Sequence, residues 1–352
     1  MPITNDLHVL SFEPMEPPSA LLTEFPLGEA RGELVERSRD EVRAVLSGAD
    51  DRLLVVVGPC SVHDPAAALE YAYRLAAAAK KHEQNLCIVM RVYFEKPRTT
   101  LGWKGLINDP GLDGTYDVRR GLRIARGLLL DILDVGVPVG CEFLDPISPQ
   151  YIADTVTWGA IGARTTESQV HRQLASGLSM PIGFKNATDG GVKVAIDACQ
   201  VGRSTHVFFG VDGDGRAAVV STTGNEDCHV ILRGGKDGPN HDGQSVAATL
   251  DALERAGLKR RLVIDASHDN SGKDHVRQAQ TAAQIGAQVA TGQMGIGGVM
   301  LESFLVGGRQ DLTAGQPLTY GQSITDACMS WDATADLLEV LAAAVAARSA
   351  LS

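Results

Sequence analysis

The most constraining feature of this chain is an alternation of two kinds of segment along most of its length. Short apolar runs rich in β-branched residues end in turn-forming or polar residues, and amphipathic or alanine-rich stretches follow them. The apolar runs cover residues 53–57, 87–94, 137–143, 158–163, 182–185, 229–232, 262–265 and 299–304. The helices predicted between them cover residues 66–81, 118–135, 168–176, 191–201, 244–256 and 275–288. Continuous apolar strands alternating with helices predict a parallel sheet that is buried on both faces.

The number of apolar runs favours one particular parallel architecture. Eight strands, each followed by a helix, close into a (β/α)8 TIM barrel of about 250 residues, which leaves roughly 100 of the 352 residues for additions. An open doubly wound sheet is the alternative, but no G-x-G-x-x-G string follows the first run. We therefore predict an α/β fold with a barrel over residues 51–348 and an N-terminal extension over residues 1–50.

Two segments depart from the alternation. The first 30 residues contain five prolines, four of which are Pro14, Pro17, Pro18 and Pro26. This arm is predicted to be mostly extended, and the apolar spacing that follows it predicts a helix over residues 32–47. Two strand-like runs, 206–212 and 216–222, are joined by an Asp-Gly-Asp-Gly turn signal. We expect a β-hairpin, over about residues 205–223, inserted between the fifth and sixth barrel strands.

Composition excludes several classes of partner. The chain has 43 acidic against 32 basic residues and a net charge of −11, which argues against nucleic acid or an anionic membrane surface. No apolar run approaches the ~20 residues of a membrane span, and the N-terminus does not resemble a secretory signal. The six cysteines form no C-x-x-C pair, so we expect a reducing compartment and a cytoplasmic protein.

Cationic residues recur where the predicted strands end, at the face on which barrel enzymes carry their reacting groups. They are Arg91, Lys96, Arg98, Arg164, Lys185 and Arg233. Each one alone is as readily explained by a surface ion pair. Several positive charges at one mouth repel each other unless an anion neutralises them, and arginine forks suit phosphate and carboxylate. The recurrence predicts strongly anionic ligands with at least one phosphate.

A second set at the strand ends consists of metal-ligand types. Its members are Cys60, His268, Glu302 and Asp326. One thiolate, one imidazole and two carboxylates suit a divalent cation such as Mn²⁺, Fe²⁺, Co²⁺ or Zn²⁺. The spacing is too wide for a local motif, and a buried inert thiol or a packed histidine is the alternative for each residue alone.

Six strings in the chain are more specific than these patterns. They are GPCSVHDP at 58–65, MRVYFEKPRTT at 90–100, GARTTES at 162–168, GFKN at 183–186, ILRGG at 231–235 and SITDAC at 323–328. Together they closely resemble the class I 3-deoxy-D-arabino-heptulosonate 7-phosphate (DAHP) synthases that aromatic amino acids regulate, and the resemblance runs from about residue 19 to 348. It implies a metal-dependent barrel enzyme that condenses phosphoenolpyruvate with erythrose 4-phosphate and releases phosphate at the start of the shikimate pathway.

The resemblance also implies roles for individual residues. The phosphoenolpyruvate-binding positions are Arg91, Lys96, Arg164, Lys185 and Arg233, and those for the phosphate of erythrose 4-phosphate are Arg98 and Thr99. The metal ligands are Cys60, His268, Glu302 and Asp326, with Mn²⁺ favoured. Lys96 is the expected proton donor, and Glu142 and His171 match positions near the reaction centre.

The resemblance further implies feedback inhibition by an aromatic amino acid and a homo-oligomer, either a dimer or a tetramer. The matching effector positions are Pro149, Gln150, Leu174, Leu178, Ser179, Phe208 and Gly210, beside the hairpin and a neighbouring subunit. Glycine at 210 favours tyrosine, because phenylalanine-sensitive relatives tend to carry serine there. Cys328, two residues beyond Asp326, is expected to approach Cys60. A thiol packed in a helix is the plainer interpretation of Cys328, and a Cys60–Cys328 disulfide formed when metal is lost is the alternative.

Two alternatives remain at this point. One is a catalytically silent barrel that senses an aromatic amino acid. The other is a related phosphoenolpyruvate-condensing synthase that uses another phosphosugar, such as arabinose 5-phosphate.

Overall fold

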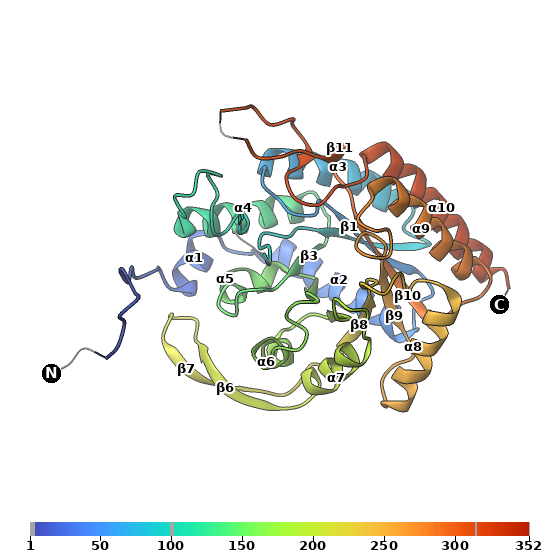
Figure 1. Ribbon diagram of the computed structural model, residues 1–352, viewed down its shortest axis with the longest axis horizontal. Helices are drawn as coiled ribbons and strands as arrows, with labels where there is room; N and C mark the ends of the chain where they lie inside the picture. Colours follow the sequence, from blue (N-terminus) through green and yellow to red (C-terminus); the bar gives the residue numbers. More distant parts are fainter. Residues whose placement is uncertain (1–3, 99–101, 314, 352) are drawn as a thin grey trace.

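Parallel strands form a closed barrel at the centre of the molecule (Figure 1). This computed structural model describes residues 4–98, 102–313 and 315–351. Around the barrel the strand order is β1-β10-β9-β8-β5-β4-β3-β2. The bounds are β1 Leu53–Gly58, β2 Leu86–Arg91, β3 Val139–Glu142, β4 Trp158–Ile161, β5 Ile182–Lys185, β8 His229–Leu232, β9 Leu262–Asp265 and β10 Ile296–Glu302. The predicted (β/α)8 fold is confirmed.

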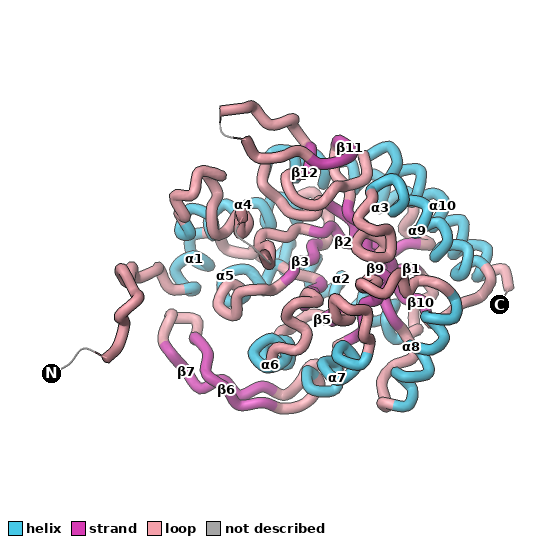
Figure 2. Tube along the Cα trace, viewed as in Figure 1, coloured by secondary structure: helices cyan, strands magenta, loops and turns pink. Residues whose placement is uncertain are grey.

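Every residue of these strands is buried. Helices cover the outside of the barrel (Figure 2) and side chains fill the inside, so neither face of the sheet meets water. This explains why the strands read as continuous apolar runs rather than as alternating ones.

The outer helices follow the strands in chain order. They are α3 Pro65–Lys81, α4 Val118–Asp134, α5 Pro149–Ile152 with the short η1 Ala153–Thr155, α6 Gln169–Gly177, α7 Lys193–Gly202, α8 Gly243–Arg255, α9 His275–Ala290 and α10 Trp331–Ser349. Aspartates cap four of them: the side chains of Asp64, Asp117, Asp242 and Asp274 accept backbone N–H groups in the first turns of α3, α4, α8 and α9. Helix α10, which packs against α9, was not among the predicted segments. No helix in the described parts of the chain has the length and apolar character needed to cross a membrane.

The N-terminal arm contains a helix that the sequence analysis missed. Residues Pro18–Glu24 form α1, although the prolines led us to expect an extended arm. Pro17 stands at the N-cap and Pro18 at the first helical position, where a missing N–H loses no hydrogen bond and the fixed φ suits the helix. The prolines therefore start this helix instead of preventing it.

Helix α2, Glu29–Ser47, closes one end of the barrel. Its Val42, Val45 and Leu46 belong to the same buried cluster as Leu54 of β1 and Met300 of β10. The barrel interior is therefore a packed core, and a ligand can reach it only from the opposite end, where the strands finish.

The inserted hairpin is present where it was expected, between α7 and β8. Strands β6 His206–Val211 and β7 Ala217–Thr222 pair antiparallel as a separate two-stranded sheet. In Figure 1 the hairpin curves past α6 toward α1. Thr222 Oγ1 lies 2.7 Å from Ser176 Oγ of α6, and at the hairpin tip the Gly213 carbonyl accepts from Ser19 N of α1 at 2.8 Å. A further pair, β11 Val306–Arg309 and β12 Gln322–Ser323, lies between β10 and α10.

Candidate active site

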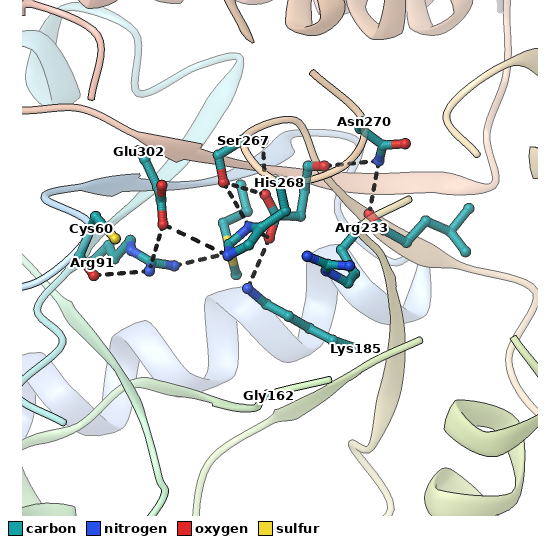
Figure 3. Close-up of polar contacts among 12 residues, drawn as sticks. Cys60, Arg91, Gly162, Lys185, Arg233, Ser267, His268, Asn270 and Glu302 are labelled. Atoms are coloured by element: carbon teal, nitrogen blue, oxygen red, sulfur yellow. Dashed lines mark hydrogen bonds and ion pairs between the residues drawn. The ribbon is translucent and has the colours of Figure 1, made fainter. Parts of the chain in front are cut away.

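The carboxyl ends of the barrel strands bring residues from distant parts of the chain together (Figure 3). Arg91, Lys185 and Glu302 are the last residues of β2, β5 and β10. Cys60 and Arg233 follow β1 and β8 by one or two residues. Because parallel strands all end at the same rim, residues up to 242 positions apart (60 to 302) share one site.

Three of the four predicted metal ligands form one group. The donor atoms of Cys60, Glu302 and Asp326 all lie within 4.8 Å of one another. His268 is outside this group but adjacent to it, with its Nε2 4.0 Å from Glu302 Oε1. That distance is too long for a hydrogen bond and allows both atoms to contact one ion at about 2.0–2.3 Å. Thiol, imidazole and carboxylate donors together fit Mn²⁺, Fe²⁺, Co²⁺ or Zn²⁺.

The surroundings of this group set its charges. Burial, with Glu302 nearby, raises the pKa of the Cys60 thiol, although Lys96 acts in the opposite direction. Burial also tends to raise the pKa of Asp326, but the nearby cationic groups, with Lys96 and Lys273 first among them, together outweigh burial and bring that pKa below its ordinary value. The group thus combines a carboxylate that is ionised at neutral pH with a thiol that a bound cation would help to ionise.

Arg91 is fully buried next to the metal group, which consists of Cys60, Glu302 and Asp326. Its Nη2 donates to Glu302 Oε1 at 3.0 Å and to the Cys60 carbonyl at 3.1 Å. The guanidinium carbon lies 3.6 Å from the centre of the Tyr93 ring, a cation–π contact. In this arrangement Arg91, expected to contact substrate, orients two of the predicted metal ligands.

Lys96 stands beside Cys60. Its Nζ donates to Cys60 Sγ at 3.0 Å and to the Cys60 carbonyl at 3.1 Å. Burial is the largest influence and would lower the pKa of this ammonium, but Cys60, Glu302 and Glu142 together outweigh burial, and the pKa is raised. Lys96 is therefore protonated and next to the metal group, as a proton donor must be.

Two other cations of the cluster have acidic partners. Lys185 Nζ lies 2.8 Å from Asp265 Oδ2, and both residues are buried. Arg233 pairs with Asp269, while its backbone N donates to Asn186 Oδ1 at 2.7 Å. Neither aspartate was predicted to have a role, although Asp265 stands at the end of a predicted strand, and that position was the signal that could have identified it.

Glu142 and Arg164 lie on neighbouring strand ends. Glu142 is buried at the end of β3, and a Cβ at Gly162 would fall 2.2 Å from its Oε1. Any side chain at position 162 would therefore collide with the Glu142 carboxylate, and glycine avoids this collision. Arg164, three residues after β4, is exposed. Arg98 is also exposed and donates from Nε to the Trp103 carbonyl at 2.8 Å.

Thr99, the second predicted residue for the sugar phosphate, lies outside the described residues.

His171 holds the loop over residues 144–148, which follows β3, through a hydrogen bond. One ring nitrogen, Nε2, lies 2.7 Å from the Leu144 carbonyl, so it carries the proton, and Nδ1 accepts from Ser168 Oγ at 2.9 Å. Both nitrogens are thus committed to the protein, which fits positioning better than contact with reacting atoms. The same loop is held by Glu95, another residue that the sequence analysis missed. Glu95 accepts from Ser148 Oγ and the Asp145 backbone N–H, and burial raises its pKa to about 7.

The predicted effector positions lie on three neighbouring elements. Pro149 and Gln150 begin α5, Leu174, Leu178 and Ser179 lie on α6 or just after it, and Phe208 and Gly210 lie on β6. Helix α6 contacts both hairpin strands, and Phe208 and Gly210 occupy the more buried face of β6. A Cβ at Gly210 would meet Val220 Cγ2 at 2.7 Å, so Val220 takes part of the space that the missing side chain leaves.

Cys328 lies next to Cys60, as expected, with its Sγ 3.4 Å from the Cys60 backbone nitrogen. It is paired with Gly308 in an isolated bridge rather than in a helix.

A closed parallel barrel with buried cations and metal-ligand side chains at its open end is typical of an enzyme for anionic substrates. Residues 28–339 match the sequence model of the DAHP synthetase I family. A phospho-2-dehydro-3-deoxyheptonate aldolase from Corynebacterium glutamicum is 56% identical over 354 residues, which cover 99% of this chain and 96% of that protein. The Phe-sensitive enzyme of that name from Escherichia coli is 55% identical over 344 residues, 98% of each chain.

A tyrosine-inhibited relative from Schizosaccharomyces pombe is 49% identical over 348 residues, covering 98% of this chain and 94% of that protein. Among solved structures, the phospho-2-dehydro-3-deoxyheptonate aldolase of Francisella tularensis superimposes with a TM-score of 0.95 at 50% identity, covering 97% of this chain and 99% of that one. The chain belongs to the DAHP synthetase I family and is an enzyme of that class.

Proposed function

We propose that this chain condenses phosphoenolpyruvate with D-erythrose 4-phosphate to give DAHP and inorganic phosphate, the first step of the shikimate pathway. The observation that carries the proposal is the convergence of Lys96, Lys185 and Arg233 on the rim that also holds the Cys60–Glu302–Asp326 group. Both substrates are phosphate esters and one adds a carboxylate, so binding them side by side costs Coulomb repulsion. A ring of cations offsets that repulsion and attracts both anions.

The metal site is assigned to Cys60, His268, Glu302 and Asp326. A divalent ion held there, with Mn²⁺ favoured, would supply Lewis acidity toward the aldehyde oxygen of erythrose 4-phosphate. Arg91 keeps Glu302 and the Cys60 backbone in place for such an ion through its two hydrogen bonds.

The bond changes define what the other residues must do. Carbon 3 of phosphoenolpyruvate forms a bond to the aldehyde carbon, and the aldehyde oxygen takes up a proton. Lys96, protonated and beside Cys60, donates that proton. Water then adds to carbon 2 and loses both of its protons: one restores the Lys96 ammonium and the other leaves with phosphate, as the carbon–oxygen bond to phosphate breaks and carbon 2 becomes a ketone. Glu142 orients this water from the end of β3.

The substrate anions are assigned to the cations of the rim. Lys185, Arg233, Arg164 and Arg91 serve the phosphate and carboxylate of phosphoenolpyruvate. Arg98, which is exposed, and Thr99 serve the phosphate of the sugar.

The test measures phosphate released by the full chain from phosphoenolpyruvate with each aldose. We expect release with erythrose 4-phosphate and Mn²⁺, and little with arabinose 5-phosphate. Turnover with the five-carbon sugar alone would assign a different synthase, and no turnover with either sugar, in protein that binds tyrosine or phenylalanine, would favour the silent sensing barrel.

We further propose that tyrosine is the inhibitor, bound beside α5, α6 and the hairpin of a dimer or tetramer. Gly210 supports this choice because its missing side chain leaves room for a hydroxyl, although Val220 takes part of that space. Calorimetry with the three aromatic amino acids decides it, and binding of phenylalanine alone would overturn it.

A further inference from the structure

Asp265 is the last residue of β9 and is fully buried. Both of its carboxylate oxygens accept hydrogen bonds. Oδ2 lies 2.8 Å from Lys185 Nζ and 2.8 Å from His268 Nδ1. Oδ1 accepts from the backbone N of Ser267 at 2.9 Å and from its Oγ at 2.5 Å. One carboxylate therefore joins a lysine of the cation cluster to a histidine beside the metal group.

These contacts determine which nitrogen of His268 carries the proton. An ionised carboxylate only accepts hydrogen bonds, so Nδ1 must be the donor. Ser267 Oγ, which lies 3.0 Å from the same Nδ1, gives its own proton to Asp265 and offers only lone pairs to the ring. The neutral ring then has an unprotonated Nε2, and Nε2 is the atom on the Glu302 side, 4.0 Å from Oε1.

Lys185 has the same dependence on Asp265. Its ammonium is buried at the end of β5 and forms an ion pair with this carboxylate. Without a fixed acceptor, a lysine with four rotatable bonds loses its preferred position.

We infer that Asp265 is a positioning residue of the active site, which fixes the His268 tautomer with Nε2 toward the metal group and holds Lys185 toward the substrate anions. The inference rests on the proposed function for the roles of His268 and Lys185. Metal-bound histidines in proteins commonly donate their other N–H to a carboxylate, and loss of that partner typically costs about 10- to 100-fold in metal affinity.

A purely structural role would give a different result. Asp265 could in that case serve only to neutralise the buried Lys185, and its loss would lower stability without changing the metal affinity of the folded protein. Metal affinity and the histidine tautomer separate the two roles, and neither requires turnover.

The first measurement uses the unmodified chain. Long-range ¹⁵N–¹H spectra of histidine-labelled, metal-free protein, with the His268 signals assigned by their loss in His268→Gln, report the tautomer. We expect Nδ1 to be protonated and Nε2 to be free. An Nε2-protonated ring would overturn the inference, and this readout stands even where an Asp265 variant does not fold.

The second measurement compares Asp265→Asn with Asp269→Asn. Both replace a carboxylate that pairs with a cation of the cluster, but Asp269 pairs with Arg233 and not with His268. Mn²⁺ titration of metal-stripped protein, followed by electron paramagnetic resonance, should show affinity weakened about 10- to 100-fold in Asp265→Asn and changed less than about threefold in Asp269→Asn. Equal Mn²⁺ affinity in folded Asp265→Asn and the unmodified chain would overturn the inference. Normal Mn²⁺ binding without phosphate release by the unmodified chain would instead count against the proposed function alone.

Discussion

A buried histidine at the closed end of the barrel should make the stability of this protein depend on pH in a specific way. His229 begins β8 inside the barrel, and its Nε2 accepts from Trp158 Nε1 at 3.1 Å. Its Nδ1 lies 3.1 Å from the Asp227 carbonyl and donates to it. Protonation of Nε2 would break the Trp158 bond and place a charge in the core, and burial accordingly lowers the pKa of His229 to about 4.

The size and sign of the effect follow from this value. A histidine in the unfolded chain has the ordinary pKa of 6.5, so between about pH 6.5 and 4 the unfolded chain binds a proton that the folded protein does not. The neutral ring therefore contributes its full stabilisation above pH 6.5, and this is lost as the pH falls. The whole window corresponds to about 3 kcal/mol in the free energy of unfolding.

His229→Gln removes this titration but keeps a polar side chain of similar size. We expect the difference in unfolding free energy between the unmodified chain and His229→Gln to shrink by about 2–3 kcal/mol from about pH 7.5 to about pH 4.5. Urea unfolding followed by tryptophan fluorescence, at equal protein concentration, measures it, and the other titrating groups cancel in the difference. A constant difference over that range would refute the reasoning.

Three further predictions concern the site and the loop beside it. Lys96→Ala should lose at least about 100-fold in kcat with an unchanged circular dichroism spectrum. The control is Lys193→Ala, which removes an exposed lysine of α7 paired with Asp197 and should leave kcat unchanged. Near-normal turnover of Lys96→Ala would remove the role assigned to Lys96. Chelation should abolish phosphate release and Mn²⁺ should restore it, and full activity of verified metal-free protein would contradict the metal site. Glu95 has a pKa of about 7 in the folded protein against an ordinary 4.5, so its contribution to stability is present below pH 4.5 and is lost as the pH rises to 7. Between about pH 4.5 and 7.5, the free energy of unfolding of Glu95→Gln should therefore rise by about 3 kcal/mol relative to that of the unmodified chain. This trend is opposite to the one expected for His229→Gln. A difference between the two unfolding free energies, measured in urea, that stays constant over this pH range would contradict the prediction.

The sequence determined the barrel and the hairpin because both depend on local patterns. A strand buried on both faces must be continuously apolar, and the turn at residues 212–215 joins two strand-like runs. The same reasoning placed Cys60, Lys185, Arg233 and Glu302 at one rim, since all parallel strands end there. It failed at α1, where prolines begin the helix, and it did not include α10.

Only the tertiary structure decided how the side chains at the rim are used. Arg91 donates to Glu302, and Asp265 accepts from both Lys185 and His268, yet nothing in the spacing of these residues distinguishes such pairs from free cations and carboxylates. Lys185 and Asp265 are 80 positions apart and meet because barrel closure places β5 and β9 on either side of β8. The strand patterns determine which residues reach the rim. The hydrogen-bond partner of each side chain, the tautomer of its ring and its charge depend on distances that only the closed barrel sets.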